Sequence, residues 1–233
     1  YASSIDLRDA YFHIPIREIL HKYLAFLHEG KLYFFRAMPF GLNVAPYIFT
    51  RVLRYPLALL HQQGIPVLAY LDDWIIWGKS PEETSRAVSI TVNTLTKLGF
   101  LINFEKSHPN PTIDTIWLGV RWLTQTGHWG IPLEKQEDLR NRIQNLYNSQ
   151  TCSRRQWEKM LGALNFVTQI LSRTRHLLQP LLRPQLLSTA ASRDVQVPIP
   201  SHLKHALRPW LEQPIMNLTE TFHSDRPPVL LWT

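Results

Sequence analysis

The chain has 233 residues, of which 45% are hydrophobic, and Cys152 is its single cysteine. This length can bury a sizeable core in two subdomains, whereas one cysteine excludes an intrachain disulfide and favours a reducing, cytoplasmic or nuclear setting. The formal charge of +7 at pH 7 favours a polyanionic partner, although a basic surface also serves solubility. No uninterrupted apolar run reaches the ~20 residues needed to cross a bilayer, so we expect no membrane partner.

Hydrophobic periodicity predicts an α+β chain in which strands dominate the first half and helices the second. The clearest helix start is Ser80-Pro81, because Ser80 can cap the helix, proline suits its first turn and Glu83 can reach back. Residues 185–200 are predicted to be irregular. In chain order, the predicted elements are strands at 4–7, 23–28 and 31–37, a helix at 44–62, strands at 67–71 and 74–77, a helix at 81–98, a hairpin at 117–129, and helices at 133–147, 153–171, 174–182 and 202–212.

Two adjacent aspartates, Asp72 and Asp73, interrupt an otherwise apolar stretch of the sequence. They fall between two predicted buried strands, at the tight turn of a hairpin, where backbone amides and solvent reduce the cost of charge. Carboxylates in such a setting need a cationic partner, and Mg²⁺ prefers oxygen ligands, so one interpretation is a metal site for phosphoryl transfer. An ordinary acidic turn is the other interpretation, since aspartate favours turns.

A pair of metal ions needs carboxylates from at least two segments, because the ions lie roughly 3.5 to 4 Å apart and their charge must be balanced. Asp6 supplies the third carboxylate, and it projects from the first predicted strand on the face opposite Ile5 and Leu7. We expect Asp6 and Asp72 to bridge the ions and Asp73 to be a more peripheral ligand. Taken alone, Asp6 would be an ordinary residue at a strand end.

Five short motifs follow one another between Asp6 and Gly119, and they surround a loop in which Gly41 suggests close backbone approach to a flat ligand. They are Asp6 with Tyr11-Phe12, Met38-Pro39-Phe40-Gly41-Leu42 with Ala45-Pro46, Tyr70-Leu71-Asp72-Asp73, Leu98-Gly99-Phe100 followed by Asn103 and Glu105-Lys106-Ser107, and Trp117-Leu118-Gly119. In this order they resemble the four palm motifs and the primer grip of reverse transcriptases. The resemblance implies a right-hand polymerase palm with an antiparallel sheet, followed by a helical thumb.

The runs 6–15 and 70–74 most resemble the DIRS-like retrotransposons, which use a tyrosine recombinase for integration. Gypsy-like and hepadnavirus-like enzymes are the nearest alternatives. The aromatic residue at Tyr11 and the run Phe40-Gly41-Leu42 occur widely among retroelements, so neither discriminates between these groups.

The resemblance implies a role for each matched residue. Asp6, Asp72 and Asp73 would be the catalytic carboxylates and would hold two Mg²⁺ ions, with Mn²⁺ as an alternative. The ring of Tyr11, otherwise a core aromatic, would lie under the incoming sugar and exclude a 2′-hydroxyl, while Lys106 would approach the triphosphate or else be a surface residue. The residues implied to bind nucleotide are Asp9, Ala10, Tyr11, Phe40, Gly41 and Lys106, and those implied to contact the DNA primer or RNA template are Tyr70, Leu71, Trp117, Leu118, Gly119, Arg154, Arg155 and Lys159.

Cationic residues concentrate on the predicted helices of the second half. Between Thr151 and Arg183, Glu158 is the only acidic residue, and the cationic ones are Arg154, Arg155, Lys159, Arg173, Arg175 and Arg183. A solvated helix face explains some of this excess. A thumb that grips a template and primer duplex explains its one-sided sign and predicts binding that weakens with salt.

The resemblance also implies an organisation in three parts. Residues 1–125 would form the palm with part of the fingers, residues 126–185 the helical thumb, and residues 186–233 a connection. Residues 229–233 would open a ribonuclease H domain fused downstream, and most of the fingers would precede the chain. Three functions are compatible with this pattern: an RNA-directed DNA polymerase, an inactive reverse-transcriptase-like module that binds nucleic acid, and a polymerase that makes RNA. The intact aspartates count against the second, and Tyr11 against the third.

Overall fold

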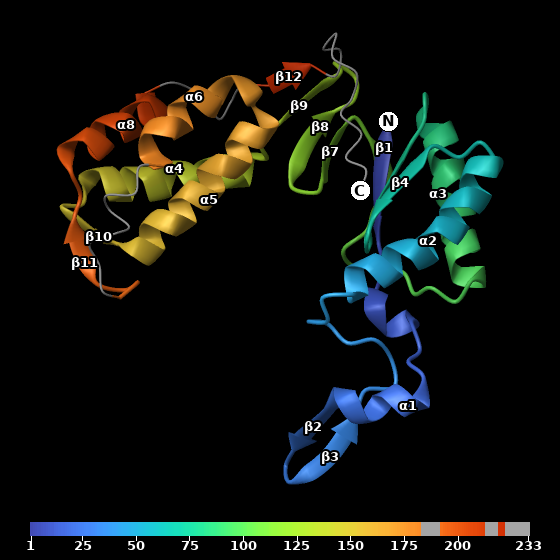
Figure 1. Ribbon diagram of the computed structural model, residues 1–233. Coiled ribbons are helices and arrows are strands. Elements are labelled where there is room, and N and C mark those ends of the chain that lie inside the picture. The colour runs from blue at the N-terminus through green and yellow to red at the C-terminus, as the bar shows by residue number, and fades with distance from the viewer. Residues whose placement is uncertain (183–191, 213–218, 222–233) are drawn as a thin grey trace. The chain divides into compact units, whose positions relative to one another are not determined.

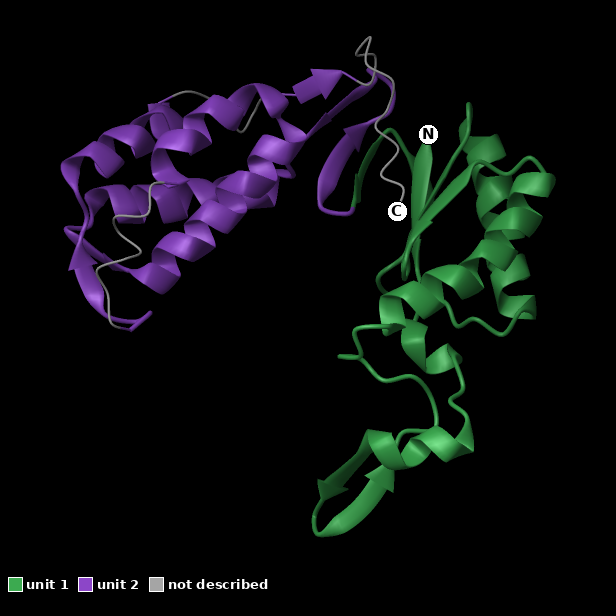
Figure 2. Cartoon of the chain, viewed as in Figure 1, with its two compact units in different colours: residues 1–117 green, residues 118–233 purple. Residues whose placement is uncertain are grey.

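The computed structural model describes residues 1–182, 192–212 and 219–221, and the chain divides into two compact units, residues 1–117 and 118–233 (Figure 2). Both units combine helices with antiparallel strands, so the predicted α+β class is confirmed (Figure 1). In the described part of the chain, none of the helices combines the length and apolar character that a membrane crossing requires.

The first unit is built on an antiparallel sheet with the strand order β4-β5-β1-β6. Helices α2 and α3 cover one face of this sheet (Figure 1). The contact between the sheet and helices is the core of the unit, and in it Phe49, Leu60, Trp74, Ile76 and Leu95 are fully buried. The elements are β1 (Ala2–Asp6), α2 (Ala45–Gln62), β4 (Val67–Tyr70), β5 (Asp73–Trp77), α3 (Pro81–Lys97), β6 (His108–Thr112) and β7 (Asp114–Trp117).

Local sequence explains where these helices begin. Ser80 precedes α3 and its Oγ accepts a hydrogen bond from the Glu83 backbone N–H at 3.2 Å, while the Glu83 carboxylate accepts one from the Lys79 N–H at 3.0 Å. Two N–H groups at the start of the helix are thereby satisfied, as the sequence predicts. Helix α2 runs through Pro56 as one helix.

A short hairpin lies between the first strand and α2. It consists of β2 (Ala25–His28) and β3 (Lys31–Phe34), and the predicted turn at Glu29 and Gly30 is confirmed by their positive φ angles of 50° and 71°. The segment before it contains the short helices η1 (Ala10–His13), α1 (Glu18–His21) and η2 (Lys22–Leu24).

The second unit packs its helices around a separate core in which Trp157, Leu164, Leu171, Leu207 and Trp210 are almost completely buried. Within this unit β12 pairs with β9, and β9 with β8, while β10 pairs with β11. The elements are β8 (Val120–Leu123), β9 (His128–Gly130), α4 (Leu133–Asn148), β10 (Thr151–Ser153), α5 (Arg154–Ile170), η3 (Ser172–Thr174), α6 (Arg175–Leu178), η4 (Gln179–Leu182), β11 (Gln196–Pro198), α8 (Ser201–Glu212) and β12 (Thr219–Thr221).

The structure differs from the sequence predictions at six elements. The helix predicted at 174–182 is replaced by the short pieces η3, α6 and η4, since Pro180 cannot donate a helical hydrogen bond. The predicted hairpin at 117–129 starts earlier, at β7, and contains two short turns. Strand β6, which contains two prolines, and the three-residue strands β10, β11 and β12 were not predicted. Residues 229–233 and Arg183 lie outside the described residues.

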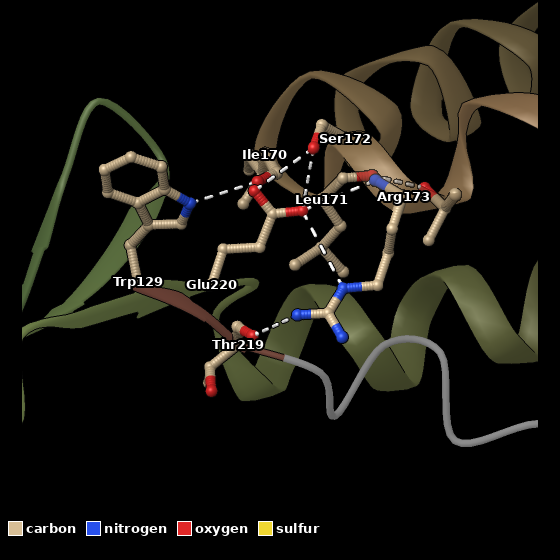
Figure 3. Close-up of polar contacts among 8 residues, drawn as sticks. Trp129, Ile170, Leu171, Ser172, Arg173, Thr219 and Glu220 are labelled. Carbon is tan, nitrogen blue, oxygen red and sulfur yellow. Dashed lines mark hydrogen bonds and ion pairs between the residues drawn. The ribbon is translucent and has the colours of Figure 1, made fainter. Parts of the chain in front are cut away.

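A cluster of polar contacts joins β12 to η3, which follows α5 (Figure 3). The Glu220 carboxylate accepts hydrogen bonds from Ser172 Oγ at 3.1 Å and from the Arg173 N–H at 3.4 Å, and it lies 3.9 Å from Arg173 Nε. Arg173 also donates to the Thr219 carbonyl at 3.0 Å, and Trp129 Nε1 donates to the Ile170 carbonyl at 3.1 Å. Segments 47 residues apart in sequence are therefore held together by one carboxylate and one guanidinium.

Replacing Glu220 with alanine is expected to destabilise the second unit by about 1 to 2 kcal/mol, because its charged hydrogen bonds are partly shielded from solvent. The side chain of Glu220 is only 18% exposed. Glu212→Ala is the matched control, since Glu212 forms an exposed i,i+4 pair with Arg208 on α8, and such pairs contribute little. Urea unfolding of both variants measures the difference in the free energy of unfolding. Equal losses in the two variants would show that Glu220 contributes no more than an exposed ion pair.

Candidate active site

The first strand brings Asp6 opposite Asp73. In the antiparallel pairing of β1 with β5, Asp6 is the partner of Asp73, and in the pairing of β4 with β5, Tyr70 is the partner of the same residue. Residues directly opposite one another share a face, with Cβ atoms roughly 4.5–5.5 Å apart. Tyr70, Asp73 and Asp6 thus form a row across three strands, while Ile5 and Leu7 are buried on the opposite face as predicted.

The turn between β4 and β5 consists of Leu71 and Asp72, and Asp73 already belongs to β5. Leu71 has a φ of 55°, in the left-handed region that leucine rarely adopts and that costs roughly 1–2 kcal/mol. The Asp72 carbonyl accepts a hydrogen bond from the Leu7 N–H at 2.9 Å, which ties the turn to the first strand just after Asp6. The strained turn therefore has a fixed place beside the end of β1.

The electrostatics of this row confirm that the acidic groups lie close together. Burial raises the pKa of Asp73, and the negative charges of Asp72 and Asp6 raise it further, while Lys106 opposes them. Burial also raises the pKa of Asp6, against the opposing effect of Lys106 and with a further rise from Asp72. Asp73 thus feels the charges of Asp72 and Asp6, Asp6 feels that of Asp72, and both feel the Lys106 ammonium group.

The donor set suits a hard divalent cation. It consists of carboxylate oxygens from two adjacent segments, and their mutual repulsion is the kind that only a cation between them relieves. Among the described residues, no three His, Cys, Asp or Glu side chains are already drawn together in the geometry of a ligand set. Asp6, Asp72 and Asp73 therefore have the chemistry for metal binding, and their side chains would have to converge on the ion.

Tyr11 and Phe40 form an aromatic wall next to these carboxylates. Their ring centroids are 5.0 Å apart, and Tyr11 also contacts the buried ring of Phe49 edge to face at 5.6 Å. Burial raises the pKa of the Tyr11 hydroxyl, and the nearby Asp72 and Tyr70 add to the rise. Phe40 is 60% exposed, so a flat ligand can reach its ring, and Gly41 follows it with a φ of 92°.

Two residues to which the sequence assigned no role connect the Lys106 segment to Asp6. The Asp6 N–H donates to Ser107 Oγ at 3.0 Å, and the Asp6 carbonyl accepts from the Asn103 N–H at 2.9 Å. The Asn103 side chain also hydrogen-bonds to the Asp6 carboxylate and lowers its pKa, and its Oδ1 accepts from the Lys106 N–H at 3.4 Å. Both residues belong to the fourth motif, and this membership was the feature of the sequence that could have indicated their role.

The segment that follows β1 turns sharply at Asp9. Asp9 has a φ of 53°, its carbonyl accepts from the Phe12 N–H at 2.8 Å, and its exposed carboxylate lies 3.6 Å from Arg8 Nε. Ala10 is buried at the start of η1. The structure therefore brings Asp6, Asp72, Asp73, Tyr11, Phe40 and Lys106 together and places Asp9 and Ala10 on the adjoining turn.

The predicted primer-grip residues fall at the division between the units, with Trp117 ending the first and Leu118 and Gly119 beginning the second. Leu118 and Gly119 have φ angles of 51° and 75°, so this turn is left-handed like that at Leu71. Lys135 Nζ donates to the Gly119 carbonyl at 3.5 Å and lies 4.7 Å from the centroid of the Phe166 ring. The turn is thus anchored to α4 and α5 within the second unit.

Two arginines of α5 form ion pairs with acidic residues. Arg154 pairs with Glu158 at 2.7 Å, Arg193 approaches the same carboxylate at 3.7 Å, and Arg155 lies 3.8 Å from Asp194. Arginine 154 holds the pKa of Glu158 below its usual value. Asp194 is thus an acidic partner from outside the segment, and Arg193 adds a cation beside Glu158, so the excess of positive charge around α5 remains.

Both the sequence and the fold of this chain are similar to those of known proteins. Residues 1–121 match the family described as reverse transcriptase (RNA-dependent DNA polymerase). Protein P of heron hepatitis B virus is 25% identical over 181 residues, which cover 76% of this chain and 22% of the viral protein. Protein P of duck hepatitis B virus (strain China) is 24% identical with the same coverage. The chain therefore spans between a fifth and a quarter of the length of these curated relatives.

Solved structures show the same fold. A foamy viral protease-reverse transcriptase in complex with dsDNA has a TM-score of 0.71 at 25% identity, covering 91% of this chain and 41% of the viral chain. The foamy viral protease-reverse transcriptase in complex with an RNA/DNA hybrid has a TM-score of 0.66 at 22% identity, covering 91% of this chain and 27% of the viral chain. This likeness confirms the palm and thumb architecture. Because the family match covers more than half of its residues, the chain belongs to the reverse transcriptase family.

Proposed function

We propose that this chain is the palm and thumb region of an RNA-directed DNA polymerase, which adds deoxynucleotides to the 3′-hydroxyl of a primer. The observation that carries the proposal is the row in which Asp6 lies opposite Asp73, with Asp72 on the adjoining turn. Two segments thereby supply carboxylates to one place beside an aromatic wall. Family membership fits this chemistry, and the activity belongs to the proposal because the chain covers only part of its relatives.

The carboxylates would hold divalent cations, on which members of this family generally depend. We assign two Mg²⁺ ions, or Mn²⁺, to Asp6, Asp72 and Asp73, with Asp6 and Asp72 bridging them. When bound, such ions lower the pKa of an attacking hydroxyl and neutralise the triphosphate. The protein contributes the placement of three carboxylates at one end of a rigid sheet.

The neighbouring side chains would select and orient the nucleotide. Tyr11, braced by Phe40 and Phe49, would leave no room for a 2′-hydroxyl and thereby favour deoxynucleotides. The exposed ring of Phe40 offers a stacking face, and Gly41 leaves the backbone accessible. Lys106, whose charge reaches the acidic row, would approach the triphosphate, and the Asp9-Ala10 turn would supply backbone amides.

Template and primer would contact both units. The structural relatives bind dsDNA and an RNA/DNA hybrid, which supports nucleic acid as the partner. We assign primer or template contacts to Tyr70, Leu71, Trp117, Leu118 and Gly119, and to Arg154, Arg155 and Lys159 on α5. Residues 1–125 would be palm with part of the fingers, 126–185 thumb and 186–233 a connection toward a ribonuclease H domain.

The finer proposal is that the chain derives from a DIRS-like retrotransposon. Its support is the sequence of the runs 6–15 and 70–74. The curated relatives reported above are hepadnaviral, and hepadnavirus-like enzymes were among the alternatives. A tyrosine recombinase gene beside the coding sequence would support the DIRS-like origin, and a gypsy-like integrase gene there would contradict it.

The proposed function predicts that the chain, joined to an upstream segment that completes the fingers, extends a DNA primer on an RNA template with Mg²⁺. The chain alone is assayed beside it. Asp72→Asn is expected to reduce the rate by at least about a hundredfold, because it removes a bridging carboxylate without changing side-chain size. Incorporation of labelled deoxynucleotide measures the effect.

A binding control separates loss of chemistry from loss of substrate. Wild type and Asp72→Asn should bind the primer and template duplex with equal affinity at matched ionic strength. Contacts with phosphates dominate this affinity, and the substitution does not remove any of them. Duplex binding without extension by either form, even with fingers restored, would leave the inactive binding module as the function.

The carboxylate row is expected to lower the folding stability of the protein at neutral pH. The pKa of Asp73 is higher in the folded protein than its ordinary value of 3.8, so above that pH the unfolded chain loses its proton first and folding stability falls. In chelator, Asp73→Asn should therefore be more stable than wild type near pH 7. The advantage should shrink as the pH falls toward 3.8 and disappear below it, where the aspartate is protonated in both states.

Thermal unfolding between pH 4 and 8 measures this difference. Glu105→Gln removes an exposed carboxylate from the neighbouring loop and should leave the midpoint unchanged at every pH. Added Mn²⁺ should raise the midpoint of wild type by binding the folded state and raise that of Asp73→Asn less. A pH-independent difference between Asp73→Asn and wild type would contradict the electrostatic explanation.

A further inference from the structure

His13 connects the nucleotide-side turn to the segment that carries Lys106, and no role has been given to it above. Its Nε2 accepts a hydrogen bond from the Leu101 N–H at 3.0 Å. A backbone N–H can only donate, so the ring proton lies on Nδ1, which donates to the Ala10 carbonyl at 3.1 Å. The imidazole therefore bridges two backbone segments as a neutral ring of one tautomer.

The position of His13 in the strand pairing explains why a side chain is needed there. Asn103 N–H donates to the Asp6 carbonyl at 2.9 Å, and Arg8 N–H donates to the Leu101 carbonyl at 2.8 Å, in an antiparallel ladder. The ladder cannot continue, because the backbone turns into the left-handed region at Asp9. In a continued ladder, a backbone carbonyl would accept the hydrogen bond from the Leu101 N–H. His13 Nε2 accepts this hydrogen bond instead.

Packing holds the ring in this orientation. The His13 ring lies 5.3 Å from that of Phe100, which is 7% exposed and contacts Phe49 at 6.4 Å. Phe49 in turn contacts Tyr11. Beside the ring is an open cavity of about 240 Å³, lined by Ile14, Val52, Tyr55, Pro56, Leu98, Gly99 and Phe100. The imidazole has packed neighbours on one side and room on the other, so a substituted side chain of similar length can be accommodated.

We infer that His13 is a positioning residue for the proposed nucleotidyl transfer, and the inference rests on that function. By fixing Leu101, it holds the chain that continues through Asn103 to Lys106 at a set distance from the Tyr11 turn. Lys106 would meet the triphosphate and Tyr11 the sugar of the same nucleotide. A loose connection between the two would weaken nucleotide binding and leave the carboxylate row intact.

Three variants test the inference in the full chain. His13→Phe keeps a ring against Phe100 but removes the acceptor, His13→Leu removes both, and His13→Gln can present its Oε1 near the place of Nε2. We expect the KM for deoxynucleoside triphosphate to rise about tenfold in His13→Phe and His13→Leu, the loss expected for one hydrogen bond, with kcat within about twofold. His13→Gln should restore most of the wild-type KM.

Amide exchange gives a readout that does not depend on catalysis. His13→Phe should speed exchange of the Leu101 and Asn103 amides, and His13→Gln should slow it again. A wild-type KM in His13→Phe, equal impairment of His13→Gln and His13→Phe, or unchanged exchange at Leu101 would each overturn the inference. If the wild-type protein extends no primer even with the fingers restored, the proposed function fails by itself, and the exchange data alone then decide whether His13 holds this segment.

Discussion

The pairing of β1 with β5 is the constraint on which the candidate site depends. It sets Asp6 directly opposite Asp73 and fixes Asp72 through the hydrogen bond between its carbonyl and Leu7. Like charges opposite one another destabilise a sheet, and burial adds to the cost. The fold tolerates this arrangement because the opposite face of the same strands, with Ile5, Leu7 and Trp74, packs into a fully buried core. An apolar face thus holds an acidic row in place.

Two neighbouring segments are tied by hydrogen bonds to the strand that carries Asp6. Asp6 is bonded to Asn103 and Ser107, and Leu7 to the Asp72 turn. Left-handed residues occur where the chain must bend sharply next to the site, at Asp9 and at Leu71. Such strain persists only where the surrounding structure enforces it, and functional sites are where it concentrates. The rigid sheet and the strained turns together position the reacting side chains.

The sequence predicted the parts of the fold that repeat a simple pattern. Alternation around Ile5 and Leu7 and the capped start of α3 are local signals, so β1 and α3 were predictable. The left-handed Leu71 carries no signal, because glycine or asparagine normally marks such a turn. Strand β6 was missed because its two prolines argue against a strand. Glu220 and Asp194 pair with arginines far away in sequence, so neither ion pair could be predicted from the local pattern.

The central claim is that Asp6, Asp72 and Asp73 converge on two divalent ions, and crystals grown with Mn²⁺, a primer and template duplex and a nucleotide test it most directly. Anomalous scattering locates the metal without reference to activity. The account predicts two peaks roughly 3.5 to 4 Å apart, with Asp6 and Asp72 as shared ligands and Asp73 nearby. Manganese bound elsewhere on the chain, with no peak between β1 and the β4-β5 turn, would contradict it.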